Sequence, residues 1–408
     1  MRSKSKKARK KRTVYRPLRS SVSKEYNIVP TKARQKKYGS KYYLGVFARI
    51  LYRTFLVIMT VVLLAVFGVY YTLYTVAHGP SETVRNALVL SAMQASATKW
   101  VPGLFLDGET VDKIVNASME KVVEEVDVIM PDEGGKPGPV YIPENEEGEQ
   151  EIPDISDGIE FHTDASGTFR AYVMIVHDPS KVFVGVSSND FPNAVRGQRI
   201  YDAAEKYGAI AAINGGEFHD PGGEGLGGQP IGLTYSQGKC VWNDGRKRTF
   251  IGIDKNNNLV VSEEMTKERA DELGIRDAVS FQNGNVLIET KDGKTLCYYA
   301  HENNGKAQRT AVGQRADGKF VFIVTDGRSA SSLGADYDDM IDMMLKYGAI
   351  NAGMLDGGSS AMMYYSNYIE KYNVDENDLD EYQRLGLVNK YKAFTRPRYL
   401  PTFFMVMP

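Results

Sequence analysis

Cysteine is nearly absent from this sequence, whose 408 residues contain only Cys240 and Cys297. Two cysteines cannot build the multi-disulfide framework that stabilises small secreted domains. They form either one bridge or two free thiols, and the sequence leaves both states open. Histidine is also scarce, with five residues, so there are few candidates for histidine-dependent catalysis.

Acidic residues are missing from the start of the chain. Residues 1–53 contain 18 Lys and Arg and one acidic residue, Glu25, whereas the remainder carries 32 Lys and Arg against 50 Asp and Glu. The overall net charge of −1 therefore describes neither part. The basic segment acts either as a cytoplasmic topology signal or as a binding site for nucleic acid or anionic lipid. We favour the topology signal and expect no nucleic-acid partner.

An uncharged apolar run follows at residues 55–77. About 20 such residues span a bilayer core as a helix. The basic residues precede the run, and Tyr70, Tyr71 and Tyr74 stand at its far end, which places the N-terminus in the cytoplasm and the C-terminus outside. A signal peptide would have an apolar region of only ~7–15 residues and a small-residue cleavage site. The pattern thus predicts an uncleaved anchor in the cell membrane.

Two segments separate this run from the rest of the chain. Residues 80–128 have helical character broken at Pro102–Gly103, and the stretch Gly108–Val128 places on one helical face Val111, Ile114, Val115, Met119, Val122 and Val123. Residues 130–157 are rich in Pro, Gly and Glu and cannot bury enough apolar surface to fold alone. We interpret the two segments as a short helical stem and a linker.

Beyond Gly158, short apolar runs rich in β-branched residues alternate with glycine turns. Helical patterns are fewer, at Arg199–Tyr207, Thr266–Leu273 and Tyr337–Tyr347. We predict an α+β fold with mixed β-sheets and a few covering helices. The predicted organisation is a basic cytoplasmic tail (1–53), a transmembrane helix (54–78), a helical stem (79–129), a linker (130–157) and a C-terminal domain (158–408).

Three segments of that domain carry polar residues that the fold alone does not require. Each places an Asn or Asp just after an apolar run and then a glycine: Ile213-Asn214-Gly215-Gly216-Glu217, Val324-Thr325-Asp326-Gly327-Arg328 and Leu355-Asp356-Gly357-Gly358-Ser359-Ser360. Arg309-Thr310 begins another apolar run. One Asp-Gly or Asn-Gly pair indicates merely a turn. Three of them, with an arginine in a strand, favour a site at strand ends.

Other chemistries fit these segments poorly. Gly-Gly-Ser-Ser could present backbone N–H groups to an anion, but it lacks the spacing and the lysine of a nucleotide-binding P-loop. Gly358-Ser359-Ser360 is not the Gly-x-Ser-x-Gly of serine hydrolases. Glu217, His219 and Asp220 match no familiar metal-ligand spacing, so we expect no metal and no cofactor.

Taken together, the motifs resemble the phosphodiester glycosidase family. The resemblance lies in Asn214-Gly215-Gly216, Arg309-Thr310-Ala311-Val312-Gly313, Thr325-Asp326-Gly327-Arg328 and Leu355-Asp356-Gly357-Gly358-Ser359-Ser360, with Arg396-Pro397-Arg398 before the last strand, and covers about residues 158–408. Two positions depart from the family: Glu217 stands where an aromatic residue is frequent, and Met354 where Asn is frequent.

The resemblance implies cleavage of the bond between a sugar anomeric carbon and a phosphate. It implies Asp326 and Asp356 as a carboxylate pair, with Glu217 as a third candidate. Arg309, or else Arg328 or Arg398, would hold the phosphate. The remaining substrate contacts would come from Asn214, Gly215, Gly216, Thr310, Gly357, Gly358, Ser359 and Ser360. The partner would be a phosphorylated glycan of the cell surface or an exopolysaccharide. The alternative is a surface domain that binds phosphorylated glycans during envelope assembly without catalysis.

Overall fold

The computed structural model describes residues 39–93, 98–118, 121–126, 154–166, 168–300, 305–329, 332–375, 377, 379–390 and 396–408. The chain divides into two compact units, residues 1–68 and 69–408. Helix α1 (Ser40–His78) crosses that division and is long and apolar enough, over Tyr42–His78, to cross a membrane. The helix begins before the predicted membrane segment, so it includes part of the basic region. Most of the predicted tail lies outside the described residues.

The largest sheet has eight strands within the described residues, in the order β1-β12-β11-β15-β13-β14-β3-β2. Their bounds are β1 (Val122–Val126), β12 (Lys294–Tyr299), β11 (Val286–Lys291), β15 (Ala349–Leu355), β13 (Thr310–Arg315), β14 (Phe320–Thr325), β3 (Phe169–Val176) and β2 (Ile159–Ser166). Strands β13 and β14 are buried along their whole length, as expected for strands covered on both faces.

Two smaller sheets complete the domain. One has the order β7-β6-β10-β8-β9, with β7 (Lys239–Asn243), β6 (Leu233–Ser236), β10 (Ile275–Phe281), β8 (Thr249–Asp254) and β9 (Leu259–Ser262). The other has the order β16-β5-β17-β4, with β16 (Met363–Tyr365), β5 (Ala211–Asn214), β17 (Thr402–Val406) and β4 (Val182–Val186). The α+β class is confirmed, but every strand pair of the described residues is antiparallel where mixed sheets were expected.

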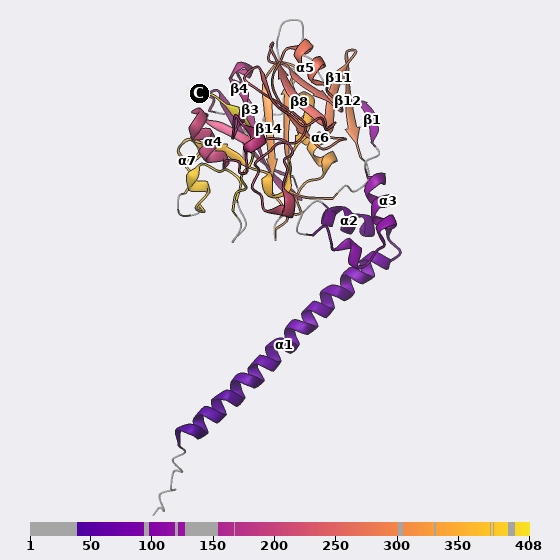
Figure 1. Ribbon diagram of the computed structural model, residues 1–408, viewed down its shortest axis with the longest axis vertical. Coiled ribbons are helices and arrows are strands. Elements are labelled where there is room, and N and C mark those ends of the chain that lie inside the picture. Colours follow the sequence, from indigo (N-terminus) through magenta and orange to yellow (C-terminus); the bar gives the residue numbers. More distant parts are fainter. Residues whose placement is uncertain are drawn as a thin grey trace, which may run out of the picture. The chain divides into compact units, whose positions relative to one another are not determined.

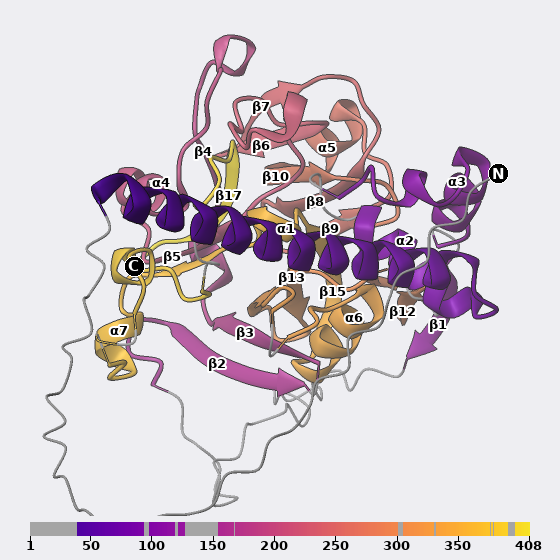
Figure 2. The ribbon, with the colours of Figure 1, turned by 90° about the horizontal axis from the view of Figure 1, so that it is seen from below.

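One continuous core joins these sheets and the helix α6 (Tyr337–Lys346). α6 contacts β11, β12 and β15 (Figure 2). It buries Met340, Ile341 and Met344. On another side of the core, the Phe322 ring of β14 meets the Phe404 ring of β17 edge to face at 6.3 Å. Burying large aromatic and aliphatic side chains contributes about 1.5–3 kcal/mol each. This packing fixes the ends of strands from different sheets against one another.

The short helices of the domain have well-formed caps. α4 (Ile200–Tyr207) and α5 (Lys267–Leu273) both end at a left-handed glycine, Gly208 and Gly274. α6 begins with a reciprocal capping box between Asp336 and Asp339. The last helix, α7 (Tyr368–Lys371), is tied through Lys371 to Asp157, which also accepts bonds from Tyr365 and Asn367.

The stem differs from its predicted form. α2 (Glu82–Met93) and α3 (Gly108–Ala117) are helices, and Val111 and Ile114 are buried between them as the spacing predicted. The second helix does not continue to Val128, however. Val122–Val126 forms β1, which pairs antiparallel with β12, and Figure 1 shows α3 leading into this strand at the sheet edge. Pairing with a distant strand outweighs the helical spacing, and the stem thereby joins the main sheet.

The two cysteines are free thiols that lie on strands of different sheets. Cys297 of β12 is buried, and burial raises the pKa of its thiol to about 11. Cys240 of β7 is partly exposed, and burial raises its pKa as well. Thiols with raised pKa values are poor nucleophiles at neutral pH, so neither is suited to catalysis.

Candidate active site

The register of the main sheet brings two of the predicted aspartates to the same edge of the sheet, the one formed by the ends of β14 and β15. Thr310, the first residue of β13, pairs with Val324 of β14 on one side and with Leu355 of β15 on the other. Asp326 and Asp356 follow these two strands, which run in the same direction on either side of β13. Since neighbouring strands lie ~4.8 Å apart, the backbones leave the sheet roughly 10 Å from each other.

Asn214 ties this edge to the four-stranded sheet. Its amide oxygen accepts hydrogen bonds from the Thr310 hydroxyl at 2.8 Å and the Met362 N–H at 3.1 Å, and its amide nitrogen donates to the Asp356 carbonyl at 2.6 Å. The side chain is fully buried. The Asn214 and Thr310 side chains therefore bind each other, and the Asn214 amide also binds the backbone at Met362 and Asp356.

The glycines that follow Asn214 allow close packing. A Cβ on Gly215 would lie 2.3 Å from the Thr402 hydroxyl, and one on Gly216 would lie 2.2 Å from the Ser280 carbonyl oxygen. The Asp356 N–H donates to the Gly215 carbonyl at 3.1 Å. The Asn-Gly-Gly segment is thus held directly against the residue that carries the carboxylate.

The Asp356 carboxyl has a raised pKa. Burial raises its pKa to about 6, and the negative charge of Glu217 acts in the same direction. A hydrogen bond with Ser360, the charge of Arg398 and the Gly357 N–H oppose this rise. A carboxyl that titrates near neutral pH is suited to general acid or base catalysis.

Two arginines accompany these carboxylates. Arg248 donates from Nε to Glu217 Oε2 at 2.6 Å, and both side chains are largely buried. Arg398 donates from Nη2 to Asp220 Oδ2 at 2.8 Å, lies 3.5 Å from the Ser360 hydroxyl through Nη1, and stands over the Phe218 ring at 5.6 Å. Each of these two guanidinium groups is therefore held by a carboxylate, Arg248 by Glu217 and Arg398 by Asp220.

Asp326 faces a different set of residues. Its Oδ2 accepts a hydrogen bond from the Tyr172 hydroxyl at 3.3 Å. Burial raises the pKa of the Asp326 carboxyl, while the Tyr172 bond and the charges of Arg170 and Lys390 oppose that rise. The negative charge of Glu217 acts on the pKa of Asp356, which makes Glu217 a candidate partner of Asp356 beside Asp326.

Arg309 is buried and its guanidinium is directed at backbone carbonyls. Nε donates to the Ala335 carbonyl at 3.1 Å and Nη2 to the Gly305 carbonyl at 2.6 Å, with the Tyr337 ring 4.8 Å away. Burial lowers the pKa of the guanidinium. These contacts hold the Arg309 guanidinium against backbone carbonyls and the Tyr337 ring. Arg328 is exposed and donates to the Ser91 carbonyl of α2 at 3.0 Å.

The Gly-Gly-Ser-Ser segment forms a short 3-10 turn, Gly358–Ser360, which Gly358 enters at a positive φ of 60°. The Gly358 N–H donates to the Gln308 carbonyl at 2.8 Å and the Ser360 N–H to the Gly357 carbonyl at 3.1 Å. Both donors are used within the fold, which weakens the anion-cradle interpretation. Ser359 is exposed, whereas Ser360 is buried beside Asp356.

Sequence reasoning missed three residues of this region as site residues. In the sequence, Arg248 is only a cation before a predicted strand, Asp220 is only a candidate metal ligand, and Tyr337 begins a predicted helix. Among the residues that the structure describes, no group of three or more His, Cys, Asp and Glu side chains is placed to hold a metal ion.

Comparison with known proteins places the motifs in a family. Residues 207–407 match the phosphodiester glycosidase family. The chain is 24% identical over 215 residues to mouse N-acetylglucosamine-1-phosphodiester alpha-N-acetylglucosaminidase, covering 49% of this chain and 40% of that protein. It is 30% identical over 131 residues to the SPbeta prophage-derived uncharacterized protein YomE of Bacillus subtilis, covering 32% of this chain and 18% of that protein.

A solved structure is similar in part. The catalytic domain of the zebrafish N-acetylglucosamine-1-phosphodiester alpha-N-acetylglucosaminidase, auto-inhibited by its pro-peptide, aligns at a TM-score of 0.45 and 21% identity, over 61% of this chain and 81% of that one. The chain spans less than half the length of the curated relatives it matches. The matched residues contain Asn214, Glu217, Arg309, Asp326, Asp356 and Arg398, so this chain carries a domain of the phosphodiester glycosidase family.

Proposed function

We propose that the protein hydrolyses sugar-1-phosphodiesters at the bond between the anomeric carbon and the phosphate oxygen. The observation that carries this proposal is the Asp356 carboxyl, whose pKa burial raises to about 6 beside a second carboxylate, Glu217. Glycoside hydrolysis uses two carboxyl groups near the anomeric carbon. Family membership supplies the reaction class, and the relatives named above supply the precedent for a phosphodiester.

In the proposed reaction a water oxygen forms the new bond to the anomeric carbon as the bond from that carbon to the phosphate oxygen breaks. The water proton passes to a carboxylate, and the electrons of the broken bond leave with the phosphomonoester. Glu217, ion-paired with Arg248, stabilises positive charge at the anomeric carbon. Asp356 exchanges the proton. Because phosphate leaves as a weak base, protonation of the leaving oxygen contributes less than in ordinary glycosides.

Arg398 is the arginine best placed to meet the phosphate. It lies beside Ser360, and its charge acts on Asp356. Arginine contacts phosphate oxygens through paired N–H groups. Asp220 and Phe218 hold its orientation. This role replaces the phosphate contact expected of Arg309, whose donors bind the Gly305 and Ala335 carbonyls.

We further propose that α1 anchors the protein in the cell membrane, with the N-terminus in the cytoplasm and the domain acting on glycans outside. The length and hydropathy of Tyr42–His78 and the 18 basic residues in positions 1–53 support this orientation. We propose a stem at residues 79–129, a linker at 130–157 and a domain at 158–408. Strand β1 of the stem contributes a strand to the main sheet.

Incubation of the full-length protein in detergent with a panel of sugar-1-phosphodiesters tests the proposed activity. ³¹P NMR follows release of the phosphomonoester, and the Asp356→Asn variant serves as the inactive control. Turnover by the wild type that falls ~10²–10⁴-fold in the variant supports the proposal. Binding of a phosphodiester by both forms without turnover would instead favour the non-catalytic glycan-binding alternative.

A further inference from the structure

One turn of the stem exposes large apolar side chains. The short 3-10 helix η1 (Pro102–Leu104) lies between α2 and α3, and with its neighbours it forms the stem turn, Trp100–Phe105. The stem turn carries no charged residue. Trp100 is 63% exposed and Leu104 is 58% exposed. Large apolar side chains that are exposed together mark a site of interaction, so the stem turn is a candidate contact surface.

The stem turn is held in one conformation by its own backbone hydrogen bonds. The Leu104 N–H donates to the Val101 carbonyl at 3.1 Å, and the Phe105 N–H donates to the Pro102 carbonyl at 3.0 Å. Pro102 itself is buried and has no N–H to satisfy. Because these donors are paired within the turn, moving the turn out of water does not leave them unsatisfied.

Phe105 places the stem turn beside the end of α1. The centre of its ring lies 5.3 Å from that of Tyr70. Tyr70 stands eight residues before His78, the last residue of α1, which corresponds to about 12 Å along the helix axis. The stem turn therefore lies alongside the last two turns of α1 and not beyond the end of the helix.

These last two turns belong to the candidate membrane span, Tyr42–His78. They expose the rings of Tyr70, Tyr71 and Tyr74. Tyrosine and tryptophan are the residues enriched at the boundary between lipid and water, because each combines an apolar ring with a polar group. The stem turn thus brings Trp100 alongside the tyrosines that mark this boundary.

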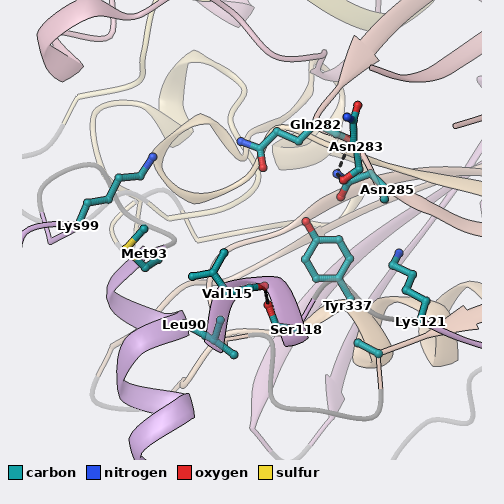
Figure 3. A pocket seen from close by; sticks show the side chains of 12 residues that line it. Leu90, Met93, Lys99, Val115, Ser118, Lys121, Gln282, Asn283, Asn285 and Tyr337 are labelled. Carbon is teal, nitrogen blue, oxygen red and sulfur yellow. Dashed lines mark hydrogen bonds between the residues drawn. The ribbon is translucent and has the colours of Figure 1, made fainter. Parts of the chain in front are cut away.

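Lys99, the residue before Trp100, faces the sheet domain. It lines a cavity of about 210 Å³ between the stem and the domain, where its side chain extends toward Gln282 (Figure 3). Pairing of β1 with β12 fixes the stem to the domain, and the Lys121 amine adds a hydrogen bond to the Val286 carbonyl at 3.3 Å. A contact made by the stem turn would therefore act on the domain as a whole.

We propose that the stem turn inserts Trp100 and Leu104 into the outer face of the membrane, as a second lipid contact beside α1. The partner is the boundary between the lipid head groups and the acyl chains, which accommodates the indole ring and buries the leucine side chain. The inference rests on the proposed anchoring of the protein by α1. A helix alone leaves the attached domain free to tilt, whereas a helix and a turn together hold it in one orientation at the membrane surface.

Tryptophan fluorescence tests this contact, because the chain contains only two tryptophans, Trp100 and Trp242. The full-length protein is reconstituted into phosphatidylcholine vesicles in which part of the lipid carries bromine, a quencher, on its acyl chains. The Trp100→Phe variant is the matched control, since it keeps only Trp242 on β7 of the sheet domain. The wild type should be quenched much more than Trp100→Phe. Bromine near the head group should quench it more strongly than bromine near the chain end.

A charge placed in the stem turn should reverse the effect. Leu104→Asp should weaken the quenching of Trp100, because a carboxylate resists transfer out of water. Val123→Asp is its control and puts the same charge on β1 of the stem, at a side chain that is 52% exposed. This control should be quenched like the wild type. Equal quenching of Leu104→Asp and the wild type would contradict insertion of the stem turn.

Flotation of the vesicles on a density gradient separates this inference from the proposed anchoring. Protein that floats with the vesicles, but in which the wild type is quenched no more than Trp100→Phe, would overturn the lipid contact and leave the α1 anchor intact. Protein that does not float would refute the anchor, and the lipid contact with it. Neither measurement requires turnover, so both are independent of the proposed hydrolysis.

Discussion

Replacing Asp356 by Asn should change stability in a way that depends on pH. The wild-type carboxyl is buried beside Glu217, and its pKa rises from 3.8 to about 6 on folding. The folded state therefore binds this proton more tightly than the unfolded state does. Between these two pKa values the folded protein holds more protons, so the free energy of unfolding contributed by this group falls as the pH rises. Asn does not titrate and removes that dependence.

The size of the effect follows from the pKa shift. About two pKa units correspond to about 3 kcal/mol, since each unit is worth about 1.36 kcal/mol. The wild type should therefore lose up to about 3 kcal/mol relative to Asp356→Asn as the pH increases from below 4 to above 6. Contributions of other titrating groups cancel in the difference between the two proteins, provided that their own environments are unchanged.

Urea unfolding of both full-length proteins in detergent at a series of pH values measures this difference. The stability of the wild type minus that of Asp356→Asn should decrease from acidic to neutral pH, with the change centred between the two pKa values. A difference that stays constant across this range would show that Asp356 is not desolvated in the folded protein. It would remove the physical basis for its role as the acid–base residue.

Three further substitutions and one protease treatment have distinct expected outcomes. Asn214→Ala should lower the free energy of unfolding by ~2–4 kcal/mol in the same urea assay, because three buried hydrogen-bond partners lose their contacts, and an unaltered midpoint would contradict these contacts. Arg309→Lys should destabilise by ~1–3 kcal/mol through the lost carbonyl contacts, and a stable variant with raised KM would restore the phosphate role. Burial raises the pKa of Glu160, but hydrogen bonds from two histidines outweigh burial and lower this pKa from its ordinary 4.5 to about 2. The stability that Glu160 contributes is therefore present above pH 4.5 and is lost as the pH falls toward 2. Glu160→Gln should flatten that loss when the free energy of unfolding is measured at a series of acidic pH values. External protease on intact cells should remove residues 158–408 and spare an epitope in residues 1–53, whereas protection of the domain would invert the proposed topology.

The strands and helix ends of the domain follow directly from local sequence signals. Gly208 after α4 and Gly274 after α5 both adopt the left-handed conformation that ends a helix. The runs of Phe320–Thr325 and Thr402–Val406 are buried strands whose β-branched and aromatic residues predict them. The position of Asp326 and Asp356 at strand ends was predictable for the same reason.

The sequence does not reveal which way a side chain turns at the end of a strand. Arg309 and Asp356 belong to motifs of equal prominence, yet the Arg309 guanidinium is buried among carbonyls, whereas the pKa of the Asp356 carboxyl responds to Ser360, Arg398 and Glu217. The strand at Val122–Val126 was missed because its valines also fit a helical face, and its partner β12 lies about 170 residues away. Such tertiary pairing decides between two local interpretations that composition alone leaves equal.

Hydrolysis in ¹⁸O-labelled water tests the central claim most directly. If the protein breaks the bond between the anomeric carbon and oxygen, the label enters the anomeric hydroxyl of the released sugar and the phosphomonoester stays unlabelled. Mass spectrometry of both products distinguishes this outcome, and Asp356→Asn should give neither product at the wild-type rate. Label in the phosphate would show cleavage of the phosphorus–oxygen bond and would contradict the assignment of Asp356 and Glu217 as a glycosidase pair.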